Sequence, residues 1–485
     1  MVDYLTSTIA LLAATSLLLP LIQLTKNRDR RLPGYLLAVA LAVAMVLVAL
    51  NTMAPASSPW FGSLLASDQL GGVFALVTLG VTLMVTLASF DSQKGLSTSV
   101  YYALLSFTAL GMVLLSYSQN LLMLFVAWEL MSLPTYVLAG FDKTATSNEA
   151  SVKYAVIGAM SSAIILYAIS LAYGLTGSTQ ISAVVNGFAS QQNALTGVAV
   201  LLFVAGFGFK MSIVPFHMWI PDAYEGAPPT ISALLAAATK KAGFIAAIRV
   251  LLALATLFVL TNNPIFTLAN VFAVLALVTM TVGNVGALTQ KSMTRLLAYS
   301  SIAQAGYILI GFVPFASNPA SIAATIGMTG AIMQIVNHAV MKGVAFLAAA
   351  LVLMQMKRGD LGAYDGLSKR MPITAFTMAV SFLALAGVPP LSGFWSKLFL
   401  FLSVANGQFG WLALAGILNS AFSLGYYAWL VKRMYIDEGE STERVEEPTW
   451  FVVVFAVAVG LIVGIGIFPQ QLINFASSAI PNIFG

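Results

Sequence analysis

Apolar runs of about 18 to 25 residues recur along the whole chain and are separated by short loops. A helical run of that length spans the hydrocarbon core of a bilayer, which is about 30 Å thick. The runs are continuous rather than alternating in polarity, which argues against a membrane β-barrel. Hydrophobic residues make up 59% of the chain and charged residues only 8%. The sequence therefore predicts an all-α polytopic membrane protein.

We expect about fourteen transmembrane helices. The first run is expected to be a retained helix rather than a signal peptide, because it lacks a basic start and a small-residue cleavage pattern. The expected spans are 4–24, 34–53, 70–90, 100–116, 120–139, 150–175, 195–216, 230–255, 266–288, 296–315, 322–354, 372–402, 410–431 and 449–468.

Basic residues mark one side of the expected bundle. Loops after even-numbered spans contain none, whereas loops after odd-numbered spans contain fifteen of the 22: Lys26, Arg28, Arg30, Arg31, Lys94, Lys143, Lys291, Arg295, Lys357, Arg358, Lys369, Arg370, Lys432, Arg433 and Arg444. By the positive-inside rule the basic loops are cytoplasmic and both termini lie outside. The net charge of +5 therefore reflects topology, and no nucleic-acid partner is expected.

The other basic residues lie inside apolar runs, where a charge costs about 2.5–3.5 kcal/mol and is a functional-site hypothesis. Glu129 is the one acid well inside a run. For Lys153 the alternative to a functional role is that its side chain snorkels to the membrane interface. For Arg249 the preferred interpretation is that it anchors the external end of its helix to lipid headgroups. The interior basic residues are Lys153, Lys210, Lys240, Lys241, Arg249, Lys342 and Lys397.

Two expected helices are interrupted beside a lysine. Pro215 follows Lys210, and the segment 387–393 precedes Lys397. Broken helices in corresponding positions of two halves indicate two inverted repeats of five helices, each with one broken helix. The expected divisions are a scaffold at 1–95, a first repeat at 96–260, a second repeat at 261–435, and an acidic loop with the last helix at 436–485.

The interior residues suit proton transfer better than cofactor or metal chemistry. Lys240 and Lys241 point about 100° apart on a helix, so one is expected to serve a relay while the other packs elsewhere. His338 and Lys342 share a helix face, so at least one of them is expected to be neutral, as a proton carrier requires. No phosphate-binding or dinucleotide motif and no cysteine is present. We therefore expect no cofactor and no metal site in this chain.

Several motifs, in order, resemble the antiporter-like subunits of respiratory complex I. They are WELMSLPTYVLAGF with Glu129, SNEASVKY with Lys153, GFGFKMSIVPFHMWIPDAYEGAPP with Lys210, TKKAGF with Lys240, and RLLAYSSIAQAGY. The similarity covers nearly the whole chain and is greatest to the N-type subunit. The segments NHAVMK and LALAGVPPLSGFWSK are more similar to the M-type subunit or to D-type antiporter subunits, and Gln304 stands where relatives often have histidine.

The resemblance implies a proton-translocating subunit, in a prokaryotic plasma membrane, of an NADH:quinone oxidoreductase or an archaeal reduced-deazaflavin dehydrogenase. It implies that Glu129 and Lys210 interact in one half-channel, Lys240 is the central residue and Lys397 the outlet, with Lys153 assisting input. Lys241, His338 and Lys342 complete the expected relay.

The partners implied are M-, L- and K-type subunits, with A-, H- and J-type subunits and, through them, a peripheral redox arm that reduces a quinone-type acceptor. The lipid bilayer surrounds the chain. Two alternatives stay open: a subunit of a stand-alone cation/proton antiporter, and a scaffold whose charges are structural.

Overall fold

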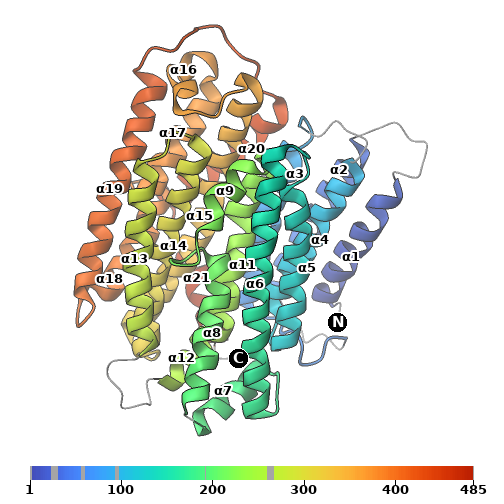
Figure 1. Ribbon diagram of the computed structural model, residues 1–485, viewed down its shortest axis with the longest axis vertical. Coiled ribbons are helices and arrows are strands. Elements are labelled where there is room, and N and C mark those ends of the chain that lie inside the picture. The colour runs from blue at the N-terminus through green and yellow to red at the C-terminus, as the bar shows by residue number, and fades with distance from the viewer. Residues whose placement is uncertain are drawn as a thin grey trace.

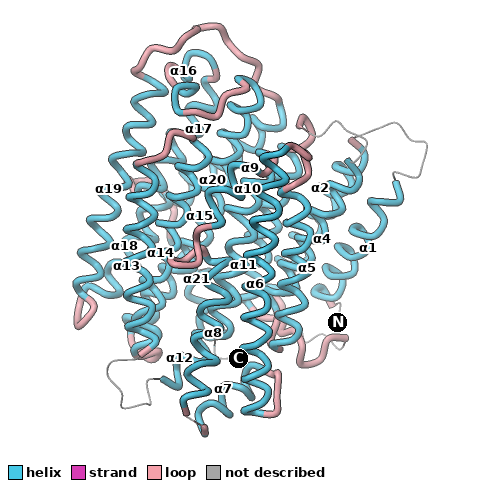
Figure 2. Tube along the Cα trace, in the orientation of Figure 1, coloured by secondary structure: helices cyan, strands magenta, loops and turns pink. Residues whose placement is uncertain are grey.

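The computed structural model describes residues 3–22, 31–55, 60–92, 98–191, 193–258 and 267–483. In this part of the chain all regular elements are helices, joined by loops (Figures 1 and 2). Thirteen of the described helices are long and apolar enough to cross a membrane. The remaining expected span, 372–402, is divided into two shorter helices. The predicted all-helical membrane bundle is thus confirmed.

The helices follow one another along the chain with short connections. Their bounds are α1 Tyr4–Ile22, α2 Leu32–Met53, α3 Gln69–Ala88, α4 Thr98–Tyr117, α5 Leu121–Ala139, α6 Ala145–Thr176, α7 Ile181–Ser190, α8 Ala194–Met211, α9 Trp219–Gly226, α10 Pro229–Leu234, α11 Lys240–Ala247, α12 Ala253–Phe258, α13 Leu268–Leu288, α14 Met293–Ser317, α15 Ile322–Met356, α16 Leu367–Arg370, α17 Pro372–Ala386, α18 Ser392–Ala405, α19 Gly410–Tyr435, α20 Thr449–Ile467 and α21 Gln470–Ser478.

Both predicted helix breaks are present. The α8 helix ends at Met211 rather than at the expected residue 216, and Ser212 adopts a left-handed conformation. The second break follows Gly387, whose φ of +90° is readily adopted only by glycine. Each break leaves terminal backbone groups without helical partners, close to Lys210 in one case and Lys397 in the other. The bounds of the two repeats stay a prediction.

The segment from Pro229 to Phe258 is one helix with two π turns, at Leu235–Thr239 and Ile248–Leu252. A π turn adds one residue to a turn, rotates the following face, and is frequent at functional sites. Lys240 and Lys241 directly follow the first π turn. The uninterrupted apolar run in the sequence did not predict these π turns.

The most buried helices lie at the centre of the bundle. The span Pro229–Ala255 and α14 are almost wholly enclosed, whereas α1, α19 and α20 keep exposed apolar faces. In Figure 1, α1 and α2 lie at one flank and α13 and α19 at the other. Charges carried by the central helices are therefore shielded from lipid by the outer helices.

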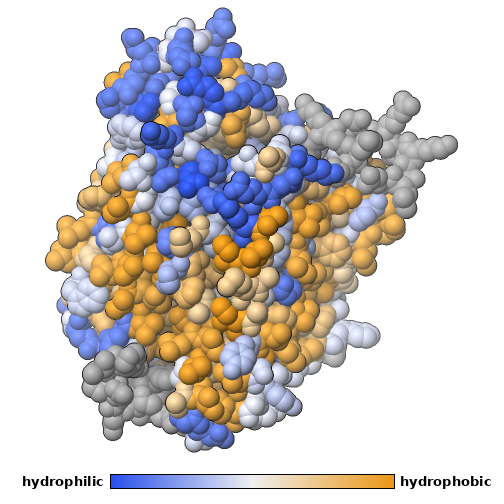
Figure 3. Space-filling view, viewed as in Figure 1, coloured by the Kyte–Doolittle hydropathy of each residue, from blue (hydrophilic) through white to orange (hydrophobic). Residues whose placement is uncertain are grey.

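One end of the bundle is strongly hydrophilic (Figure 3). There the loop after α19 lies over α16, and a backbone hydrogen bond joins Val445 to Arg370. Ser292 and Asp360 form a bridge at the same end. The sixth expected span begins at Ala145 rather than at residue 150, and Thr144 caps α6 by accepting a hydrogen bond from the backbone N–H of Ser147.

Candidate functional site

Lys210 lies in the last turn of α8 and is buried. Its Nζ donates hydrogen bonds to Tyr154 Oη at 2.7 Å and Ser132 Oγ at 3.1 Å. Ser132 lies one turn along α5 from Glu129, whose carboxylate accepts a hydrogen bond from Ser162. Among the described residues no direct ion pair joins Glu129 to Lys210. The two charged groups are linked instead through one turn of α5, and their joint role stays a prediction.

An aromatic stack lies beside the Lys210 amine, which is 5.1 Å from the centre of the Tyr154 ring. Tyr154 lies parallel to the Trp219 indole, with ring centroids 4.6 Å apart and planes at 9°. The indole Nε1 donates to the Phe209 carbonyl at 3.1 Å. Sequence reasoning did not single out Tyr154 or Trp219, although both stand inside the motifs that carried the family resemblance.

Lys240 and Lys241 are both buried and reach different helices. Lys240 Nζ donates to Ser301 on α14, at 2.6 Å to its carbonyl and 3.2 Å to its hydroxyl. Lys241 Nζ contacts Nδ1 of His338 on α15. The two amines thus contact different helices, both in the expected second repeat, and the expectation that only one of them serves a relay stays a prediction.

His338 and Lys342 belong to the same buried cluster, as their spacing predicted. Lys342 Nζ donates to the hydroxyl of Ser300, the residue before the Lys240 partner Ser301. His338 Nε2 has no hydrogen-bond partner among the described residues, and an ordered water commonly satisfies such an atom. No described carboxylate forms an ion pair with these amines, so burial of several full charges together is strongly disfavoured.

Two glutamines continue the row of buried polar side chains from the lysine and histidine cluster towards the second helix break. Gln334 Nε2 donates to Gln304 Oε1 at 2.7 Å, and Ser396 donates its hydroxyl proton to Gln334 Oε1. All three side chains are fully buried. Sequence reasoning noted Gln304 alone, since uncharged amides in apolar runs give no comparable signal.

Lys397 lies directly beside the second break. Its Nζ donates to the Ala386 carbonyl at 2.9 Å, at the end of α17, and to Ser420 Oγ at 2.8 Å. The amine also lies 4.7 Å from the centre of the Tyr307 ring. The break thus supplies a carbonyl acceptor that a continuous helix would have used itself.

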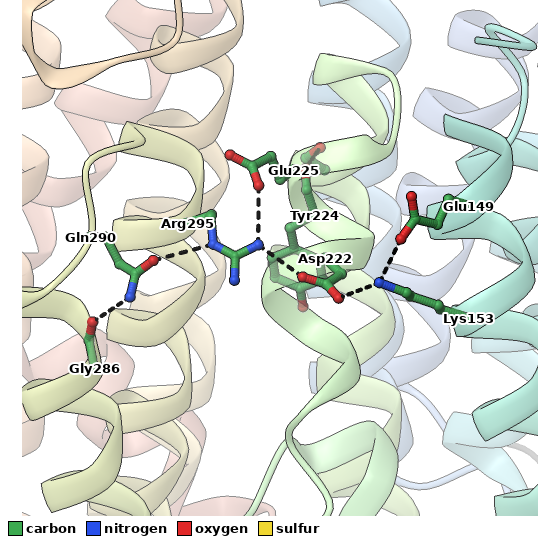
Figure 4. A network of polar contacts seen from close by, with 9 residues as sticks. Glu149, Lys153, Asp222, Tyr224, Glu225, Gly286, Gln290 and Arg295 are labelled. Carbon is green, nitrogen blue, oxygen red and sulfur yellow. Dashed lines mark hydrogen bonds and ion pairs between the residues drawn. The ribbon is translucent and has the colours of Figure 1, made fainter. Parts of the chain in front are cut away.

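Lys153 lies apart from the buried cluster. Its side chain is 45% exposed and pairs with Glu149 at 2.7 Å and Asp222 at 2.9 Å, which matches the interfacial alternative (Figure 4). Asp222 also pairs with Arg295 at 2.8 Å. Partial burial raises the pKa of the Asp222 carboxyl, but hydrogen bonds from Lys153 and Arg295 outweigh it and hold that pKa below its usual value.

The expected headgroup anchor at Arg249 is wrong. The guanidinium is buried and binds both oxygens of Asp68, each at 2.9 Å. It also donates to the Ser116 carbonyl. A guanidinium so far from water needs such a set of acceptors. The ion pair between Arg249 and Asp68 connects the start of α3 to the second π turn.

Together these groups form a buried series of amines, hydroxyls, amides and one imidazole. Such groups can accept and donate protons when an amine or imidazole changes charge. In the described residues no group of three His, Cys, Asp or Glu side chains is placed to hold a metal ion. Proton exchange is therefore the chemistry that this arrangement best supports.

Comparison with known proteins agrees with the motifs. Residues 118–423 match the family described as "NADH:quinone oxidoreductase/Mrp antiporter, TM". The chain is 43% identical to the F(420)H(2) dehydrogenase subunit N of Methanosarcina mazei over 437 residues, 86% of this chain and 85% of that protein. It is 37% identical to the NADH-quinone oxidoreductase subunit N of Moorella thermoacetica, covering 100% of this chain and 98% of the relative. A chain of respiratory complex I from Thermus thermophilus superposes with a TM-score of 0.81 at 30% identity, covering 97% of this chain and 99% of its own length.

Proposed function

Because this chain belongs to the NADH:quinone oxidoreductase/Mrp antiporter family, as an antiporter-like N-type membrane subunit of the complex I family, we propose that it carries protons through its buried basic residues. The observation that carries this proposal is the series of enclosed, hydrogen-bonded amines running from one helix break to the other. The proposed relay residues are Glu129, Lys210, Lys240, Lys241, His338, Lys342 and Lys397.

The relay works by alternate protonation of neighbouring bases. A neutral amine accepts a proton, and its hydroxyl or carbonyl partner stabilises the charged form until the proton moves on. Ser300 and Ser301 are consecutive and bind Lys342 and Lys240, so they connect these two amines. Gln304 and Gln334 offer polar positions for water between that pair and Lys397.

Energy for uphill transfer comes from other subunits. Moving one charge against 100 mV requires about 2.3 kcal/mol, and the sequence contains no phosphate-binding or dinucleotide motif and no cysteine. The partners proposed are the M-, L- and K-type membrane subunits, the A-, H- and J-type subunits, and a peripheral arm that transfers electrons to a quinone-type acceptor. A stand-alone sodium antiporter is less well supported, since sodium prefers several oxygen ligands at one place and the buried cluster is dominated by amines.

The orientation follows from the charged loops. The hydrophilic end that carries the loops after α15 and α19 is proposed to face the cytoplasm, and both chain termini to lie on the opposite side.

The proposal is tested with Lys210→Ala and Glu129→Ala in the assembled complex, reconstituted in vesicles. Each variant is expected to lower proton pumping at least about tenfold, as loss of a proton-transfer group does, while the complex still assembles. Lys369→Ala, at an exposed lysine, is the matched control. Normal pumping by both assembled variants would leave the scaffold alternative standing.

A further inference from the structure

An ion-pair network at the hydrophilic end joins three helices that are far apart in sequence (Figure 4). Asp222 on α9 accepts hydrogen bonds from Lys153 of α6 at 2.9 Å and from Arg295 of α14 at 2.8 Å. Arg295 also pairs with Glu225 at 3.1 Å, and Lys153 with Glu149 at 2.7 Å. Asp222 is therefore the shared acceptor between the two halves of the bundle.

The same short helix also contacts the surroundings of buried Lys210. Trp219 lies one turn before Asp222 on α9 and stacks on the Tyr154 ring. Tyr154 directly follows Lys153 and accepts the Lys210 hydrogen bond at 2.7 Å. The first turn of α9 is thus held by consecutive residues of α6: the carboxylate of Asp222 by Lys153 and the indole of Trp219 by Tyr154.

The third helix carries the partners of the other lysines. Arg295 lies in the first turn of α14, and Ser300 and Ser301 follow less than two turns later. Those serines bind Lys342 and Lys240. One continuous helix therefore connects the hydroxyl partners of the central lysines to the Arg295 contact with Asp222.

We propose that Asp222 and Arg295 are positioning residues that hold α9 so that Tyr154 remains the acceptor of Lys210, which links the proton state of the second half to that of the first. This inference rests on the proposed function, since it concerns the timing of the same relay. When Arg295 leaves Asp222 and Glu225, α9 loses its ion pairs to α14, the Trp219 indole no longer fixes the Tyr154 ring, and Lys210 exchanges its partner.

The exposure of the network suits a reversible link. The Arg295 and Asp222 side chains are 30% and 36% exposed, and an ion pair at such a site shifts an equilibrium by up to about fivefold. A contact of that strength biases the position of α9 without locking it. The coupling is therefore expected to be measurable and modest.

The test is a double-mutant cycle in the reconstituted complex, with proton pumping and electron transfer measured separately. Asp222→Asn and Arg295→Gln are each expected to lower pumping by about two- to fivefold, with assembly and electron transfer retained. In a Tyr154→Phe background, Asp222→Asn is expected to cause no further loss, because the hydroxyl through which it acts is absent. An equal fold-loss in both backgrounds, or no loss with Tyr154 intact, overturns the inference.

Two controls separate a positioning role from a general structural one. Asp222→Glu keeps the charge and should restore pumping, whereas a packing role would not be rescued by the longer side chain. Arg358→Gln removes exposed ion pairs to Asp360 and Glu440 at the same end and should leave pumping unchanged.

Normal pumping by Lys210→Ala and Tyr154→Phe would overturn the proposed function itself. A loss in those two variants but not in Asp222→Asn overturns only the positioning role.

Discussion

The buried pair between Arg249 and Asp68 allows a quantitative prediction that does not depend on the function. The guanidinium is 4% exposed and the Asp68 side chain 9%. Arg249→Met removes the charge and both contacts to the Ser116 carbonyl while keeping much of the side-chain volume. Asp68→Asn removes the opposite charge and keeps the helix cap on Gly71, since asparagine caps helices about as well as aspartate.

Either single substitution leaves one buried charge without its counter-ion. Breaking such a pair costs about 3–5 kcal/mol, whereas removing both charges together is often close to neutral. We therefore expect both single variants to loosen the attachment of α3 to the bundle. The double variant Asp68→Asn/Arg249→Met should be close to the parent protein.

Thiol labelling measures this loosening directly, because the chain has no cysteine. Ala75 on α3 is fully buried, so Ala75→Cys in the membrane-embedded complex reacts only when α3 opens. The labelling rate should rise between about 10²-fold and 10⁴-fold in the single variants, at about 1.4 kcal/mol for each factor of ten. A single variant that labels as slowly as the parent, or a double variant that labels as fast as the singles, would refute the reasoning.

Two further predictions concern the second break and the surface network. Lys397→Met keeps the packing against the Tyr307 ring but removes the proton carrier, so vesicle pumping should fall at least about tenfold with assembly intact; full pumping would remove Lys397 from the relay. Asp222 has a lowered pKa, so its stabilising contacts are present above the usual carboxyl value of about 3.9 and are lost as the pH falls through the lower folded value. Thiol labelling of Ala223→Cys, at a buried position, is measured as a ratio to the labelling of a free thiol at the same pH, because only the thiolate reacts. This ratio should be constant from pH 7 to about pH 5, and a rise within that range would contradict the assigned contacts.

Much of the architecture could be predicted from the sequence because lipid acts on each segment separately. A run of apolar residues long enough to span the bilayer forms a helix wherever it occurs. Proline and glycine identified both breaks, since Pro215 and Gly387 act on the local backbone. The interior lysines were found for the same reason, because a charge in an apolar run is conspicuous without any knowledge of its neighbours.

The errors in the site arose where a partner comes from a distant part of the chain. Arg249 was expected to reach lipid headgroups, yet its carboxylate partner is 181 residues away in sequence. Asp68 lies just before α3 and was not singled out, because an acid outside an apolar run is not conspicuous. Gln334 and Ser396 were not singled out because uncharged polar residues in a helix give no signal until their neighbours are known.

The sequence by itself determined that this chain is a helical membrane bundle with two breaks and an unusual number of interior lysines. The tertiary structure alone decided which hydroxyl, carbonyl or imidazole each lysine binds, and that Lys153 lies at the surface while Lys210 does not. The physical reason is that hydrophobic burial is a property of a segment, whereas a buried polar group is satisfied only by the particular atoms that helix packing brings within about 3 Å.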